Sequence, residues 1–144
     1  YNFCIDLNEG MVKKSENVRL TLNQKARELD KQKQDFQTKY QNNAYLSPER
    51  AQQEYNRIAK LEQDLQTLSN KLQSELMSEN EKNSLQLRDS INAFLKEYNK
   101  TKGYSMIISN TGFDNLLYAD SIYNITKEIV EGLNARYSSP APKK

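Results

Sequence analysis

The chain has 144 residues, of which 36% are hydrophobic and 28% are charged, and its formal net charge at pH 7 is +2. This composition is typical of long helices with one buried stripe, and it argues against a large hydrophobic core within the single chain. The small net charge gives no argument for nucleic-acid binding, which needs clustered cations, and no stretch approaches the about 20 apolar residues of a membrane span.

Residues from about Asn2 to Asn42 are predicted to form a first long helix. Its apolar positions step by threes and fours and repeat every seven residues, which favours coiled-coil packing. Lys33 interrupts this stripe with a charge, but its long stem can lie along apolar neighbours while its ammonium group reaches water. The stripe consists of Val18, Leu22, Ala26, Leu29, Lys33, Phe36 and Tyr40.

A turn is predicted at residues 42–48, followed by a second helix from Pro48 to about Lys100. Ser47 can cap free backbone N–H groups, Pro48 fits the first helical position, and Glu49 favours the positive end of the helix dipole. Folding the chain about Ser47 also brings apolar residues opposite one another. The pairs are Phe3 with Ile91, Leu7 with Leu87, Val18 with Leu76, Leu22 with Leu72, Ala26 with Leu68, Leu29 with Leu65, and Phe36 with Ile58. Residues 1–102 are therefore predicted to form a long antiparallel coiled-coil helical hairpin.

The periodicity changes after Gly103. Residues 104–109 and 116–119 are β-prone runs separated by turn-forming residues, so they are predicted to form a small β-hairpin. A last amphipathic helix is predicted to open at Ile125-Thr126, with Thr126 as its cap. Residues 103–137 are expected to form a small α+β base that serves as the assembly body, followed by a disordered tail at residues 138–144. The predicted fold class is mainly α with a small β-hairpin.

A lone two-stranded hairpin is only marginally stable in water, so its edges need cover. Association of several copies through the strand edges is the simplest way to supply that cover. The chain is therefore expected to form a homo-oligomer. The candidate oligomerisation residues are Tyr104, Met106, Ile108, Leu116 and Tyr118.

The chain contains few side chains that could carry out catalysis or bind a metal ion or cofactor. The chain contains no histidine, which removes the usual general base and the commonest metal ligand. Cys4 is the sole cysteine, so no intrachain disulfide can form, and its expected role is that of a small buried thiol. The four glycines are scattered and form no phosphate-binding loop. No catalytic, metal-binding or cofactor-binding residue is predicted, and the chain is not expected to be an enzyme.

Tyrosine is abundant, with nine copies, and several aromatic residues gather near the predicted turn. They either pack the turn and the helix seam or leave some rings available to hold apolar segments of another protein. The client-binding candidates are Phe36, Tyr40, Tyr45, Leu46 and Tyr55. Cations of the first helix are either plain solvated surface or, in a cavity between several hairpins, an attraction for acidic clients. They include Lys14, Arg19, Lys25, Arg27 and Lys39.

Four motifs in the C-terminal third carry a family resemblance. They are Phe94-Leu95-Lys96-Glu97-Tyr98, Gly103-Tyr104-Ser105-Met106-Ile107-Ile108, Leu116-Leu117-Tyr118-Ala119-Asp120, and Asn124-Ile125-Thr126 leading into Val130, Leu133-Asn134 and Tyr137. With the order of the elements, these motifs resemble the Skp/OmpH family of periplasmic chaperones over about Leu7 to Tyr137. Asn124 stands where that family has an aspartate.

The resemblance implies a homotrimer whose strands join into a small body that carries three helical hairpins. The hairpins of that family hold unfolded outer-membrane proteins between them without ATP, in the periplasm. Members also begin with an apolar strand of the same sheet, and this chain starts just beyond where that strand would end. The strand and a signal segment are therefore expected to be missing from this chain. The chain is also expected to have no cofactor, no nucleic-acid partner and at most peripheral contact with a membrane.

Two other interpretations remain. A structural coiled-coil adaptor would pair its helices with another helical protein and would present a continuous external apolar stripe on the second helix. A cytosolic prefoldin-like chaperone also combines helical hairpins and strands, but its strands lie between the two helices, whereas both helices here precede Tyr104.

Overall fold

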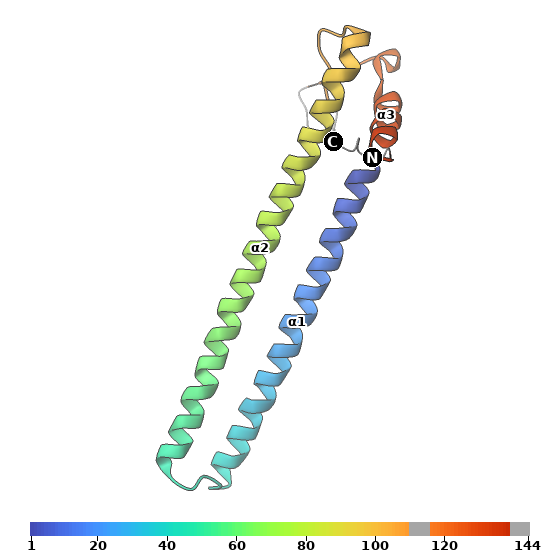
Figure 1. Ribbon diagram of the computed structural model, residues 1–144. Coiled ribbons are helices and arrows are strands. Elements are labelled where there is room, and N and C mark those ends of the chain that lie inside the picture. Colours follow the sequence, from blue (N-terminus) through green and yellow to red (C-terminus); the bar gives the residue numbers. More distant parts are fainter. Residues whose placement is uncertain (110–115, 139–144) are drawn as a thin grey trace, which may run out of the picture. The chain divides into compact units, whose positions relative to one another are not determined.

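The computed structural model describes residues 1–109 and 116–138, and Figure 1 shows the order of their elements. Two long helices, α1 (Asn2–Gln41) and α2 (Pro48–Lys102), are followed by a 3₁₀ turn, η1 (Ser121–Tyr123), and a short helix, α3 (Thr126–Ser138). The chain divides into two compact units. The hairpin unit is Glu9–Glu81, and the terminal unit combines Tyr1–Asn8 with Lys82–Lys144.

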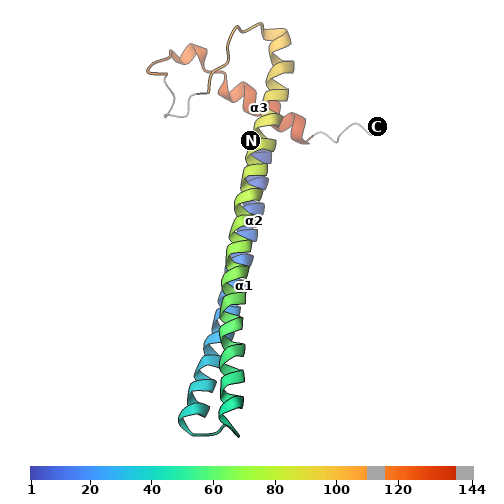
Figure 2. The ribbon, with the colours of Figure 1, turned by 90° about the vertical axis from the view of Figure 1, so that its left-hand side faces the viewer.

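In the hairpin unit, α1 and α2 run antiparallel, as Figures 1 and 2 show. Leu29, Ala51 and Ile58 are its buried residues within the described chain. Lys14 forms an ion pair with Glu79, and Lys33 donates to Glu62 at 2.7 Å. Each glutamate lies one residue from the position that the predicted mirror about Ser47 assigns, so the two helices and their register are confirmed.

The turn between the helices has a defined end on each side. Asn43 adopts a left-handed backbone conformation, with φ of 51°, and its N–H donates to the Tyr40 carbonyl at 3.2 Å. The Ala44 N–H donates to the Lys39 carbonyl at 2.9 Å, which completes a Schellman motif with Asn43 in the position that glycine usually occupies. The carbonyl groups of Lys39 and Tyr40, at the end of α1, are thereby paired.

The start of α2 confirms the predicted helix restart. The Ser47 hydroxyl accepts the Arg50 N–H at 3.3 Å, and the Ser47 carbonyl accepts the Ala51 N–H at the same distance. Hydrogen bonds from its own backbone N–H and from Ser47 lower the pKa of the Glu49 carboxyl group. A carboxylate in this position also complements the positive end of the helix dipole.

In the terminal unit, α3 packs on the last turns of α2. Leu133, with 3% of its surface exposed, is the most buried residue among those described, and Gly132 lies against the ring of Phe94. The first residues of α1 join this contact, because the Asn2 N–H donates to Asn134 at 2.8 Å and the Tyr137 hydroxyl donates to Asp6 at 2.7 Å. The bond to Asp6 raises the pKa of the Tyr137 hydroxyl.

The predicted strands are not formed in this single chain. Residues 104–109 and 116–120 carry no regular secondary structure, and the turn predicted at residues 110–115 lies outside the described residues. A pair of short strands has too few partners to stabilise its own ladder, so this segment needs further strands before it becomes a sheet. The tail predicted at residues 138–144 also lies outside the described part, except for Ser138, which ends α3.

Two smaller predictions are wrong. Thr126 lies within α3, and the side chain of Asn124 accepts the Thr126 N–H at 3.0 Å, because a short amide side chain reaches the N–H two residues ahead. Cys4 is exposed, because it follows Phe3 on α1 by one residue and is therefore turned by about 100° from the face that Phe3 packs.

Candidate functional site

Four of the five predicted client-binding residues gather at the turn of the hairpin unit. The ring of Phe36 is the centre of this cluster, with centroid distances of 5.9 Å to Tyr40, 5.6 Å to Tyr45 and 6.2 Å to Tyr55. Phe36 and Tyr40 lie one helical turn apart on α1, and the Schellman turn returns the chain so that Tyr45 and Tyr55 reach the same place. We call these four residues together with Leu46 the tip cluster.

Exposure divides the tip cluster into two parts. Phe36 and Tyr45 are half-buried and support the turn. Tyr40, Tyr55 and Leu46 are 61%, 57% and 96% exposed, so their apolar surfaces face solvent. Packing therefore accounts for the first pair, whereas the other three side chains offer apolar surface that the hairpin unit does not use.

Charged side chains make up half of the lining of a hollow beside the tip cluster. Its lining residues are Lys39, Ala44, Tyr45, Leu46, Arg50, Gln53, Glu54 and Arg57. Arg57 donates twice to Glu54, at 2.7 Å and 2.9 Å, which lowers the pKa of that carboxyl group. Burial, assisted by Glu54, raises the pKa of the Tyr45 hydroxyl.

The cations of this hollow were only partly predicted. Lys39 belongs to the predicted set on the first helix, but Arg50 and Arg57 come from α2 and were missed. The signal was available, because both arginines lie within three turns of Pro48 and therefore close to the tip. Two other predicted cations have partners in the hairpin unit, since Lys14 pairs with Glu79 and Arg19 with Glu16.

A second exposed apolar region lies in the terminal unit, between α2 and α3. Of the predicted oligomerisation residues, Tyr104, Met106, Ile108 and Tyr118 are exposed, and Leu116 is half-buried. Leu117, Ile122 and Tyr123 are also exposed but are not among the predicted oligomerisation residues, and Leu117 is 99% exposed. Exposed apolar groups this dense usually mark an interaction surface.

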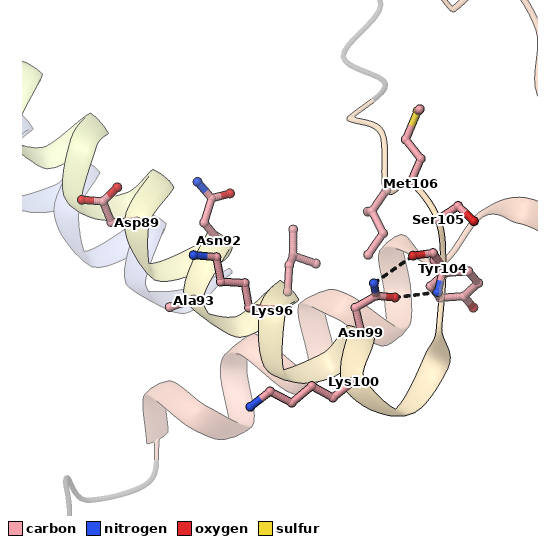
Figure 3. A pocket seen from close by; sticks show the side chains of 11 residues that line it. Asp89, Asn92, Ala93, Lys96, Asn99, Lys100, Tyr104, Ser105 and Met106 are labelled. Carbon is pink, nitrogen blue, oxygen red and sulfur yellow. Dashed lines mark hydrogen bonds between the residues drawn. The ribbon is translucent and has the colours of Figure 1, made fainter.

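Figure 3 shows a hollow between the last turns of α2 and the start of this region. Asn92, Lys96 and Asn99 line it from α2, and Tyr104, Met106 and Ile107 line it from the segment that follows. Asn99 makes two hydrogen bonds across this gap to the backbone of Tyr104, at 2.7 Å and 2.9 Å. The segment after Gly103 is thereby held beside the helix that precedes it.

Comparison with known protein families decides the assignment. The family model described as outer membrane protein (OmpH-like) matches residues 1–133. The chain belongs to the OmpH-like family. No curated protein and no solved structure matches it.

The match places this OmpH-like chain in a family with a helical fold, in agreement with α1, α2 and α3. Across residues 1–109 and 116–138, no helix is both long enough and apolar enough to cross a bilayer. The same residues contain no group of three or more histidine, cysteine, aspartate or glutamate side chains that could hold a metal ion.

Proposed function

We propose that this OmpH-like protein is an ATP-independent holdase chaperone that binds unfolded outer-membrane proteins in the periplasm. The observation that carries the proposal is the family match over residues 1–133, because it spans both long helices and most of α3. The tip cluster supports it, since Tyr40, Leu46 and Tyr55 expose apolar surface at a turn where nothing in the hairpin unit covers them.

The mechanism needs no catalytic residue. Unfolded outer-membrane proteins expose apolar strand segments that aggregate with one another. Several exposed side chains, each making a weak contact, can hold such segments through multivalency and keep them apart. We propose the tip cluster as one of these contact regions, with the cations Lys39, Arg50 and Arg57 favouring segments that also carry carboxylates.

We also propose that the protein works as a homotrimer, assembled through residues 103–137 as the base. The exposed apolar groups of the terminal unit favour assembly, because water would otherwise cover Met106, Leu117 and Tyr118. In the assembled state the β-prone runs at 104–109 and 116–119 would gain partner strands, of which the described part of the single chain has none.

The adaptor alternative receives no support from the hairpin unit. A helix that docks on another helix needs an apolar residue every three or four positions along one face. On the α2 part of this unit, the large apolar residues that stand exposed are Tyr55 and Met77, which about six helical turns separate. The described residues therefore show no continuous outer stripe there.

Light scattering from an unfolded β-barrel membrane protein, diluted out of denaturant, tests the holdase proposal. The full-length protein is expected to suppress the scattering in stoichiometric amounts and without ATP. Scattering that rises as fast as in buffer alone would contradict the proposal. Sedimentation equilibrium of the same sample tests the trimer, and a monomer at every concentration would contradict it.

Variants at the tip test where clients bind. Leu46→Ser and Tyr40→Ser change exposed side chains, so the free energy of unfolding should change little while suppression of scattering weakens. Met77→Ser is the matched control, since Met77 is 75% exposed on α2 and lies outside the tip cluster. If Met77→Ser weakens the suppression of scattering as much as the tip variants do, the proposal that clients bind at the tip cluster is contradicted.

A further inference from the structure

Asn99 bridges the end of α2 and the segment that follows it. Its side-chain Oδ1 accepts the Tyr104 N–H at 2.7 Å, and its Nδ2 donates to the Tyr104 carbonyl at 2.9 Å, as Figure 3 shows. Its backbone carbonyl also accepts the Gly103 N–H at 2.9 Å. One residue of the helix therefore fixes both the helix end and the first residue of the segment.

The two side-chain bonds have the pattern of a strand partner. In an antiparallel ladder, a residue uses its own N–H and its own carbonyl toward the same neighbour. The Asn99 amide presents one acceptor and two donors, so it can replace that neighbour for Tyr104. The N–H and the carbonyl of Tyr104 are therefore both hydrogen-bonded, as they would be to a neighbouring strand.

The turn between these residues supports the same arrangement. Gly103 has a φ of 70°, a conformation that redirects the chain at the end of a helix and that other residues rarely adopt. The ring of Tyr104 stacks on Tyr98, with centroids 6.4 Å apart and an angle of 24°. Backbone and ring contacts together set the direction in which the chain leaves α2.

The residues after Tyr104 remain available to pair with another strand. Residues 105–108 have no strand beside them in the described chain. Ile107 is half-buried and lines the hollow against α2, whereas its neighbours Met106 and Ile108 are exposed. A segment with no regular secondary structure, no strand beside it and exposed apolar side chains is suited to β-strand addition.

We propose that Asn99 is a positioning residue for self-assembly, which holds the backbone of Tyr104 beside the end of α2 so that residues 105–108 present their edge to a second copy of this chain. The proposal rests on the homo-oligomer of the proposed function and adds the residue that prepares its interface. The second copy is the fitting occupant because it carries exposed apolar side chains of the same kind, at Leu117 and Tyr118, on a segment that also lacks a strand partner.

Asn99→Ala in the full-length protein tests this role, with Asn92→Ala as the matched control. Asn92 is an exposed asparagine of the same helix that lines the same hollow. Asn99→Ala removes the prepared conformation of Tyr104, so self-association measured by sedimentation equilibrium should weaken by about tenfold or more. Hydrogen exchange at the Tyr104 amide should accelerate by a similar factor, while helical circular dichroism stays unchanged.

A rescue variant separates positioning from general stability. Asn99→Gln keeps one amide acceptor and both donors, so it should recover part of the lost association. Equal association of wild type and Asn99→Ala, or equal loss in Asn92→Ala, would overturn the role of Asn99 alone. A wild-type protein that stays monomeric would instead overturn the homo-oligomer on which the inference rests.

Discussion

The ring of Phe94 occupies the space that a side chain at Gly132 would need. A Cβ atom at Gly132 would overlap Cζ of that ring and would lie 3.0 Å from its Cε2. Because Leu133 beside it is the most buried residue described, α3 depends on this close approach to α2. The glycine lets two helices meet that the sequence separates by more than twenty residues.

Gly132→Ala is expected to lower the free energy of unfolding by about 1 kcal/mol, because overpacking outweighs the gain in helix propensity. Gly10→Ala is the matched control in α1, where an added Cβ meets nothing within 4 Å. The control should stabilise the protein by up to about 1 kcal/mol. Urea unfolding measures both, and a stabilised Gly132→Ala would contradict the close contact.

Asn43→Gly is expected to leave stability unchanged or to raise it slightly, because glycine adopts the left-handed conformation at φ of 51° without a Cβ penalty. Asn43→Ala should destabilise the hairpin unit by about 1 kcal/mol, because alanine has neither that freedom nor the local hydrogen bonding of asparagine. Thermal melts followed by circular dichroism check the order of the three proteins. An alanine variant as stable as wild type would argue against the Schellman turn.

Leu65→Asp should disrupt the hairpin unit, at a cost of about 3 kcal/mol, because it places a charge among apolar neighbours. Leu65 shares a cleft between the two helices with Leu22, Ala26 and Leu29. Gln63→Asp changes an exposed position on the same helix and is expected to cost far less. Helical circular dichroism at 222 nm, a standard helix band, would follow the loss.

Tyr45→Ala provides the contrast to Leu65→Asp. Its ring lies 5.6 Å from Phe36, so its loss should cost about 1 kcal/mol and leave the hairpin unit folded. Client capture in the light-scattering assay should either stay the same or weaken, and it should not be abolished by unfolding. A melt as low as that of Leu65→Asp would contradict this expectation and would show that the hairpin unit needs Tyr45 in order to fold.

Acid should loosen the contact between α2 and α3 through Glu128. Lys102 donates to Glu128 at 2.7 Å and lowers the pKa of that carboxyl group below its ordinary 4.5. A pKa that folding depresses contributes stability above the unfolded value, and this contribution is lost as the pH falls through the folded value. Stability should therefore decline below pH 4.5 as Glu128 becomes protonated.

Glu128→Gln should reduce the difference in stability between about pH 7 and about pH 3, because the group that titrates is gone. Glu131→Gln is the control on the same helix, where Lys127 stands 3.9 Å away. Urea unfolding at the two pH values measures the difference. An unchanged difference in Glu128→Gln would mean that the pair with Lys102 contributes nothing to folding.

The helices and their pairing could be predicted because their signals are local or periodic. Ser47 and Pro48 start α2 through bonds to residues only three or four positions away. The seven-residue repeat then allows few registers, and Lys33 opposite Glu62 shows that the chain adopts the predicted one. The tip cluster follows from the same turn, since Phe36 and Tyr55 flank it closely in sequence.

Other features depended on contacts that no local pattern encodes. Asn99 looked like any polar residue of an amphipathic helix, and its role appears only when Tyr104 lies beside it. Strand propensity at residues 104–109 predicted a hairpin, but residues 1–109 and 116–138 of the single chain supply no partner strand to complete it. Arg50 differs from these, because its place just after the turn in sequence already puts it near Tyr45 and Leu46.

The sequence by itself determined two long helices and the residue at which the chain reverses, because capping bonds and heptad spacing act within a few residues of each other. Motifs in the C-terminal third carried the family resemblance, which the match over residues 1–133 confirms. Tertiary structure decided which side chains stay exposed at the tip, how Gly132 meets Phe94, and which backbone groups Asn99 holds. Gly132 and Phe94 are far apart in the chain, so their contact depends on how α2 and α3 pack in the terminal unit. Asn99 and Tyr104 are close in sequence and meet because the chain turns at Gly103, and the tip side chains are placed by the turn of the hairpin unit.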